Sequence, residues 1–388
     1  MYNVLMLGIV SFFTDISSAM IFPLIPTFLI ETLKASPILL GTIEGVAESS
    51  MSILKVVFGY YSDKLEKRKI FATAGYTTSA LGKMLLAISA TWTGVLFSRT
   101  LDKLGKTIRT APRDAIIVES VDKSRKGAAF GLHRALDTLG SVLGVAIAAY
   151  VLWQSPDNIR LVFYWAVIPA VISVTVMFVV VRDKKRVSTD PVKEKPKLNL
   201  KWSVLPRDLK IFLGISFVFA LGNSSTLFLI LKAGDMGFLP LYIVLLYGVY
   251  NVSHALLSYP ASKLSDRIGR KNLLVAGYFL FGIVYLTFAL VESASLLWLL
   301  FAVFGLYAGL TDGVEKAYIS DVAPPEIRAT ALGMHATVVG VMTLPASVFA
   351  GWLWEVVGSS TPFYFSAITA FVATILVSTY VYSFQQRT

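Results

Sequence analysis

The chain has 388 residues, of which 55% are hydrophobic and only 15% are charged. Soluble globular proteins carry about 25% charged residues, so this composition excludes an ordinary soluble domain and predicts an integral membrane protein. Cysteine is absent, which excludes disulfides and thiolate chemistry, and the formal net charge is +11.

Long apolar runs separated by polar breaks predict twelve membrane-spanning helices. A crossing needs roughly 20 helical residues, and runs of this length without period-two alternation favour helices over the strands of a closed barrel. The N-terminal run is too long for the apolar core of a signal peptide, so it is predicted to be a retained first helix. The spans are expected at 3–31, 37–60, 69–91, 94–120, 126–153, 159–181, 207–232, 238–261, 272–291, 295–321, 327–356 and 361–384.

Lysine and arginine gather in alternate loops of this pattern, at 62–69, 121–127, 182–206 and 265–271. Because cytoplasmic loops collect these residues, those loops and both termini are predicted to be cytoplasmic, in a multi-pass protein of the cytoplasmic (plasma) membrane. This topology accounts for much of the positive charge and leaves no basic face for nucleic acid.

A polar stretch, VRDKKRVSTDPVKEKPKLNLK at 181–201, divides the spans into six and six. It predicts a flexible connecting loop over 182–206, between bundles at 1–181 and 207–388. The bundles resemble each other, since SDKLEKRK and SDRIGRK are 203 positions apart and AFGLH and ALGMH are 202 apart. Such an internal repeat predicts an all-α integral membrane protein with twelve transmembrane helices in two pseudo-symmetric six-helix bundles.

The loop between the second and third spans of each half carries a motif. The second copy, SKLSDRIGRK, has Asp266, Arg267, Gly269, Arg270 and Lys271, and the first, GYYSDKLEKRK, has Gly59, Asp63, Arg68 and Lys69, with Ser262 and Glu66 at two glycine positions. Both copies resemble the signature G-x-x-x-D-R-x-G-R-K/R of the major facilitator superfamily. The resemblance covers essentially the whole chain, and it implies the fold of that family and a secondary transporter that works by alternating access.

The two motif copies also suggest a gate. An aspartate at a cytoplasmic helix end, followed by cations, can pair across the interface between the bundles and lock one conformation. The residues predicted to take part in gating are Asp63, Arg68, Asp266, Arg267 and Arg270. The alternative is that these charges only set the topology.

Two further stretches match family motifs in part. SRTLDKLG in the fourth span resembles the motif found there at Arg99 and Gly105. LGSVLGVAIAA in the fifth span resembles the glycine stripe of proton-coupled exporters at Gly140 and Gly144, with Val145 in place of its proline. A role in export and a purely structural role in close helix packing therefore both stay open.

The fourth span holds the densest intramembrane charge. At about 100° per residue, its charged side chains fall within an arc of roughly 140°: Arg99, Asp102, Lys103, Lys106, Arg109, Arg113 and Asp114. A charge at mid-bilayer costs about 3 kcal/mol, so these side chains are expected to face a watery cavity or acidic partners.

Acidic residues are available at matching depth on neighbouring spans, and intramembrane ionisable groups usually mark solute or proton pathways. The residues predicted to bind or couple the solute are Asp15, Glu44, Glu48, Arg99, Asp102, Lys103, Lys106, Arg109, His133, Arg134 and Asp137. Within this set, Lys106 and Arg109 are expected nearest the solute, balanced by Asp15, Glu48 and Asp137. The alternative is a set of structural ion pairs, and His335 is expected to be structural.

The predicted function is proton-coupled secondary transport of a small polar solute or drug, anionic or zwitterionic, with export favoured over import. The alternatives are an uptake symporter for an organic anion and a non-transporting receptor on the same fold. No HExxH, Walker or dinucleotide loop and no serine elbow occur, so enzyme activity, a metal and a cofactor are not expected. The expected partners are the solute, protons and the lipid bilayer, and the chain is expected to be a monomer.

Overall fold

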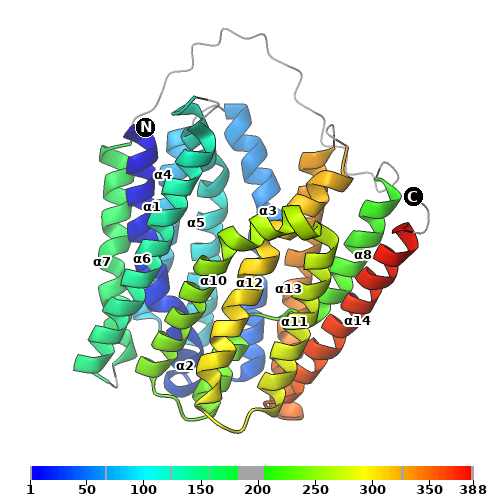
Figure 1. Cartoon of the computed structure of the whole chain (residues 1–388). Helices are drawn as coiled ribbons and strands as arrows, with labels where there is room; N and C mark the ends of the chain where they lie inside the picture. The colour runs from blue at the N-terminus through cyan, green and yellow to red at the C-terminus, as the bar shows by residue number, and fades with distance from the viewer. Residues whose placement is uncertain are drawn as a thin grey trace.

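The computed structural model describes residues 2–65, 68–122, 125–156, 158–181, 205–324 and 327–385. Within these ranges the chain is helical and contains no strand. The elements are α1 (Tyr2–Ile21), η1 (Phe22–Leu24), α2 (Ile25–Thr27), η2 (Phe28–Thr32), α3 (Pro37–Leu65), α4 (Arg68–Ile88), α5 (Trp92–Glu119), α6 (Lys126–Gln154), α7 (Ile159–Val179), α8 (Arg207–Gly222), α9 (Leu227–Asp235), α10 (Pro240–Ile268), α11 (Arg270–Leu290), α12 (Leu296–Val322), α13 (Arg328–Val356) and α14 (Thr361–Gln385). The predicted all-helical, twelve-span fold is confirmed, with α1 to η2 as the first span and α8 with α9 as the seventh (Figure 1).

The seventh span is broken, whereas the sequence predicted a continuous helix over 207–232. The break lies between α8 and α9, at Asn223–Thr226. Polar side chains of this kind compete with the helix for backbone hydrogen bonds: the N–H of Leu227 donates to Ser225 Oγ (3.3 Å), and the N–H of Ser225 donates to Ser347 Oγ (3.0 Å). The prediction of an unbroken helix was therefore wrong at this point.

The charged helices pack against one another. By length and composition, nine helical stretches of the described ranges are apolar enough to cross a membrane, and α3, α4 and α5 are not among them. These three helices have 29, 21 and 28 residues, enough for a crossing. Since α5 packs on both α3 and α4, much of their polar surface is turned inward, away from lipid.

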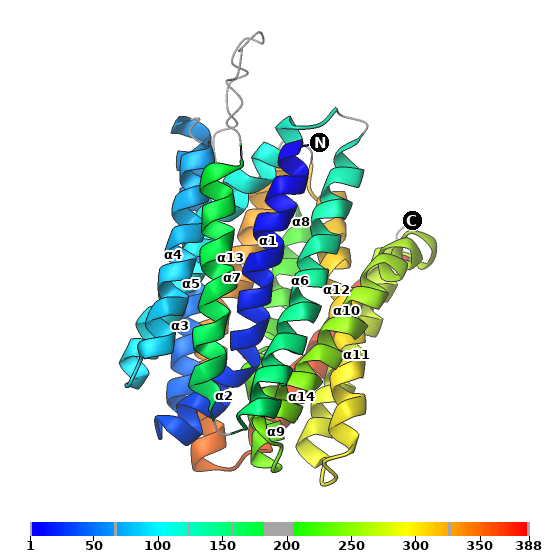
Figure 2. The same ribbon diagram turned by 90° about the vertical axis from the view of Figure 1, so that its left-hand side faces the viewer.

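The first six spans meet the last six chiefly along two helix pairs, α3 against α13 and α6 against α10. Within the first six, α1 lies between α6 and α7 (Figure 2). Glycines permit the closest approach between the halves: a Cβ on Gly41 would collide with the carbonyl group of Ser347, and one on Gly351 would lie 2.7 Å from Ile38 Cα. Small residues at such crossings let helix backbones pack closely in a membrane.

Among the residues that the structure describes, the buried apolar side chains that join the halves form one cluster, toward one end of the molecule. We call the end where α7 finishes and α8 starts the connector end, and the opposite one the distal end. A large apolar cluster toward the distal end contains residues of both halves, such as Phe28 and Phe228. At the connector end each half has its own cluster, one including Val181 and the other Leu205. The halves are therefore sealed together at the distal end, and each is self-contained at the connector end.

Candidate functional site

Between α1, α5, α6 and α10 lies a cavity of about 340 Å³, which we call the basic cavity. Its charged lining residues are Asp15, Lys106, Arg109, Arg113, Arg134 and Asp137. Four cations thus face two acids, and the remaining lining includes hydroxyl groups and the side chains of Asn251 and His254. The cavity is large enough for a small metabolite and carries an excess of positive charge.

Arg109 is a cation of this cavity for which burial, a ring contact and an Nη1 unsatisfied among the described residues are all defined. It is 6% exposed, its guanidinium lies over the ring of Tyr76 at 4.5 Å, and it makes no hydrogen bond to another described residue. Gly75 brings α4 close beneath it, since a Cβ there would meet the Arg109 backbone N at 2.7 Å. A planar guanidinium with free N–H groups can bind a carboxylate or phosphate through two parallel hydrogen bonds.

A polar chain leads from the α4 side of this bundle to the carboxylate of Asp137. His133 Nδ1 lies 3.2 Å from Asp137 Oδ2, and His133 Nε2 lies 3.0 Å from Ser11 Oγ, which in turn lies 3.2 Å from the Tyr76 hydroxyl. The other oxygen of Asp137 is buried and has no hydrogen-bond partner among the described residues. His133 therefore stands behind Asp137 and orients it rather than lining the cavity.

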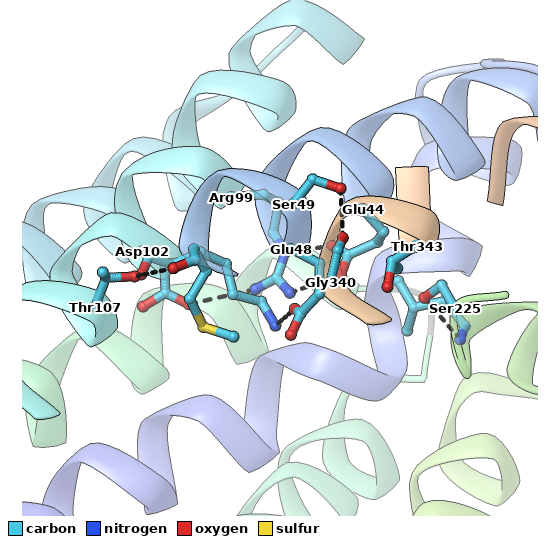
Figure 3. Close-up of polar contacts among 12 residues, drawn as sticks. Glu44, Glu48, Ser49, Arg99, Asp102, Thr107, Ser225, Gly340 and Thr343 are labelled. Carbon is cyan, nitrogen blue, oxygen red and sulfur yellow. Dashed lines mark hydrogen bonds and ion pairs between the residues drawn. The ribbon is translucent and has the colours of Figure 1, made fainter. Parts of the chain in front are cut away.

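A second cavity, of about 410 Å³, lies toward the distal end, and we call it the polar cavity. Phe22, Glu44, Glu48 and Lys103 line it from the first half, and Asn223, Ser224, Ser225, Thr226 and Thr343 line it from the second. Figure 3 shows Glu44 and Glu48 on α3 facing the α13 segment of Gly340 and Thr343, with Ser225 beyond. Lys106 interacts electrostatically with Asp15 of the basic cavity and with Glu48 of the polar cavity, so it stands between the two.

Ion pairs behind the polar cavity tie α3 and α5 together. Arg99 binds Glu44 with two bonds, Nε to Oε1 at 2.6 Å and Nη2 to Oε2 at 3.1 Å, and both side chains are buried. Arg99 Nη1 also lies 3.3 Å from Asp102 Oδ2, and Ser79 donates a hydrogen bond to Asp102. Neither Arg99 nor Asp102 lines one of the two cavities.

The predicted set is therefore divided between the two cavities and their surroundings. Asp15, Lys106, Arg109, Arg134 and Asp137 meet in the basic cavity. Glu44, Glu48 and Lys103 meet in the polar cavity, where Glu48 pairs with Lys103. Glu48 thus makes its direct ion pair with Lys103, and it interacts with Lys106 through electrostatics over a longer distance.

Sequence reasoning missed Lys83, a fully buried amine in the middle of α4. Its Nζ donates to the Thr14 carbonyl (3.2 Å) and to Ser18 Oγ (2.9 Å), which ties α4 to α1 beside Asp15. The signal was a lysine well inside the third predicted span, 14 residues after Lys69 at its edge. The hydroxyl residues of the polar cavity were also missed, since serine and threonine carry no comparable signal in a membrane helix.

The gating hypothesis is tested only in part. The side chains of Asp63 and Asp266 lie outside the described residues. Arg68 pairs with Glu119, while Arg270 lies 2.5 Å from Asp321 and donates to the Ala317 carbonyl (2.7 Å). In this conformation each of these two arginines therefore pairs with an acid at a helix end of its own half, and pairing across the interface stays a prediction. The two pairs are 202 positions apart, the spacing of the internal repeat, and the exposed Arg267 makes no described pair.

The glycine stripe of the fifth span packs against the first. A Cβ on Gly140 would lie 3.1 Å from Phe12 Cα, and one on Gly144 would lie 3.0 Å from the Cβ of Ala19. This geometry favours the packing role that the sequence left open. The predicted connecting loop spans 182–206, and residues 182–204 of it lie outside the described residues.

Comparison with known proteins places the chain in a family. The sequence profile of the Major Facilitator Superfamily matches residues 7–253 and 213–383. An uncharacterised MFS-type transporter of Methanocaldococcus jannaschii is 40% identical over 382 residues, 97% of this chain and 94% of that protein. Multidrug resistance protein MdtH of Proteus mirabilis is 22% identical over 340 residues, 87% and 83% of the two chains. The crystal structure of the nucleoside transporter NupG has the same fold, with a TM-score of 0.75 at 16% identity over 99% of both chains. The chain therefore belongs to the Major Facilitator Superfamily of membrane transporters.

Proposed function

We propose that the chain moves a small anionic solute across the cytoplasmic membrane by alternating access. The observation that carries this proposal is a cavity lined by four cations and two acids, in which Nη1 of Arg109 has no hydrogen-bond partner among the described residues. Charges inside a membrane protein are costly unless they are paired or hydrated. An anion in the basic cavity would supply the missing partner, with Arg109 as its bidentate ligand and Lys106 as a second positive charge.

Alternating access requires two bodies that move around this site. We propose residues 1–181 and 207–388 as these bodies and 182–206 as their cytoplasmic connection. The shared apolar cluster and the close α3–α13 packing seal the distal end. With the lysine- and arginine-rich loops in the cytoplasm, this conformation is the one closed toward the outside.

Proton coupling is assigned to the two acids of the basic cavity. Asp15 interacts electrostatically with Asp137 across the cavity, and with Lys83 from α4 and Lys106 and Arg109 from α5. Two carboxylates in one site repel each other, and a bound proton relieves that repulsion. The solute anion and the proton both interact with this one set of charges, so solute and proton binding are linked.

For direction, we propose export. The glycine stripe resembles that of proton-coupled exporters, and one relative is named a multidrug resistance protein. Export driven by an inward proton gradient requires antiport, in which the solute and the proton bind in turn, and Asp15 and Asp137 are then the groups that take the proton. Inside-out vesicles, in which the proton gradient is reversed relative to the cell, separate this direction from uptake.

The solute class is tested by binding of small anions to the purified protein in detergent. Wild type is screened by thermal shift against phosphate monoesters, carboxylates, amines and uncharged sugars, and hits are followed by isothermal titration calorimetry. We expect anions alone to stabilise the protein. Arg109→Lys should weaken the binding of these anions roughly tenfold, because a single ammonium group replaces a guanidinium that can form two parallel hydrogen bonds.

The matched control is Arg160→Lys. Arg160 lies over the ring of Phe28 at 4.9 Å and donates to the Ala87 carbonyl, in the apolar distal cluster rather than in either cavity. This variant should bind the same anions like wild type. Stabilisation by amines or uncharged sugars in place of anions, or full anion binding by Arg109→Ala, would refute the proposed solute class.

A further inference from the structure

The polar cavity holds hydrogen-bonding groups that the protein does not use. Within the described parts of the chain, the side chains of Asn223, Ser224 and Thr226 make no hydrogen bond, although they line a cavity of about 410 Å³. Ser224 is buried, and Asn223 and Thr226 are half-buried, so these groups are available to a molecule in the cavity. Here the helix break turns an amide and two hydroxyls toward the cavity, while the neighbouring Ser225 is used to hold the break itself.

The facing wall is charged, but its charges are already compensated. Glu44 is bound through both oxygens by Arg99, and Glu48 is bound by Lys103. Glu48 keeps 30% of its side chain exposed and Lys103 keeps 16%, so both retain hydrogen-bonding capacity toward the cavity. This wall therefore does not call for a charged ligand group, whereas the basic cavity does.

The two cavities are neighbours. Lys103 and Lys106 stand on successive turns of α5, one lining each cavity, and Lys106 interacts with acids of both. A single solute of moderate size can therefore place one group in each. The first half supplies charge to both cavities, and the second half supplies the neutral hydrogen-bonding groups of the polar one.

We propose that the polar cavity binds a neutral, hydroxyl-bearing part of the same solute whose anionic group lies at Arg109, so that the substrate class is a hydroxylated organic anion, such as a sugar phosphate or a sugar acid. This proposal rests on the proposed function, because it needs the anion in the basic cavity. Asn223 supplies both a donor and an acceptor, Thr226 and Ser224 supply hydroxyls, and Glu48 accepts. Hydroxyls with alternating donor and acceptor roles match this set, and an alkyl chain would leave all of it unpaired.

The test compares anions that differ only in their hydroxyls. Glycerol 3-phosphate is measured against n-propyl phosphate, and gluconate against hexanoate, by isothermal titration calorimetry on the full-length protein in detergent. For each pair whose members bind to wild type, the hydroxylated anion should have an affinity roughly tenfold or more above that of the alkyl anion. A factor of this size corresponds to about one satisfied hydrogen bond. Asn223→Ala and Thr226→Val, measured separately, should each reduce that ratio while leaving the affinity for the alkyl anion unchanged.

The control variant is Thr42→Val, which removes a hydroxyl that α3 already uses for the Ile38 carbonyl (2.8 Å) and that lines neither cavity. It should keep the wild-type ratio. Equal binding of hydroxylated and alkyl anions, or a ratio that both cavity variants leave intact, would overturn this inference and leave the anion proposal standing. Failure of all four anions to bind would overturn both.

Discussion

Replacing Glu44 by glutamine removes a charge while keeping the shape of the side chain, and it leaves the buried guanidinium of Arg99 without its bidentate partner. In the structure the two side chains are only 4% and 6% exposed, so water cannot take over. Removing one partner of a buried pair costs about 3–5 kcal/mol. Asp102 stays 3.3 Å from Arg99 Nη1 and retains part of the compensation, so we expect the lower end, about 3 kcal/mol.

The double variant Glu44→Gln with Arg99→Met separates a stranded charge from lost packing. If the single variants are destabilised mainly by an uncompensated charge, removing both should be much less damaging than their sum, by about 2 kcal/mol or more. The assay is equilibrium unfolding in mixed detergent micelles, followed by tryptophan fluorescence. Asp114→Asn is the control, because Asp114 is 40% exposed in its pair with Arg113 and such pairs contribute about 1 kcal/mol or less.

Additive single effects in that cycle would refute the reasoning, since they would show that Arg99 and Glu44 are stabilised independently of each other. The outcome also bears on the site. Arg99 lines neither cavity and Glu44 lines only the polar one, so anion binding at Arg109, measured by calorimetry in the folded double variant, should persist.

Three further predictions concern topology, gating and the distal seal. Alkaline phosphatase fused after Thr388 should be inactive, and high activity would place the C-terminus outside the cytoplasm. Asp63→Asn and Asp266→Asn should change the distribution of distances between spin labels on the connector ends of the two halves, and identical distributions would reduce the motif to a topology signal. Gly41→Val should part α3 from α13, because its side chain would collide with the carbonyl of Ser347. The chain has no native cysteine, so a single cysteine placed at the distal end should react faster with maleimide in this variant. An unchanged labelling rate would contradict the prediction.

The helical, twelve-span fold was predictable because lipid leaves the backbone few choices. A peptide group in hydrocarbon must be satisfied within its own segment, so long apolar runs become helices whatever their detailed sequence. The break at Asn223–Thr226 was not predictable in the same way. Its four polar residues sit in an otherwise apolar run, and the partner that fixes the break, Ser347, lies on another helix.

For the site, periodicity placed charges on helix faces but could not assign partners. The charged side chains of α5 were expected to face a watery cavity or acidic partners, and the structure divides them between a buried ion pair, the polar cavity and the basic cavity. Which carboxylate Lys103 or Lys106 meets depends on the rotation and height of α3 against α5, and neither is encoded in the spacing of residues on one helix. Lys83 shows the same limit, since its partners are a backbone carbonyl and a serine of α1.

The uneven distribution of apolar clusters has a thermodynamic consequence for the transport cycle. Parting the halves at the distal end exposes the shared cluster to water, while the two connector-end clusters each stay whole. Exposure of apolar surface raises the heat capacity, so the enthalpy of this conformational change varies with temperature and a van't Hoff plot of the two populations curves. Because hydrophobic association weakens on cooling, lower temperature shifts the balance toward the distally open state. The growth temperature of the cell is thus one of the quantities that set the resting conformation of this transporter.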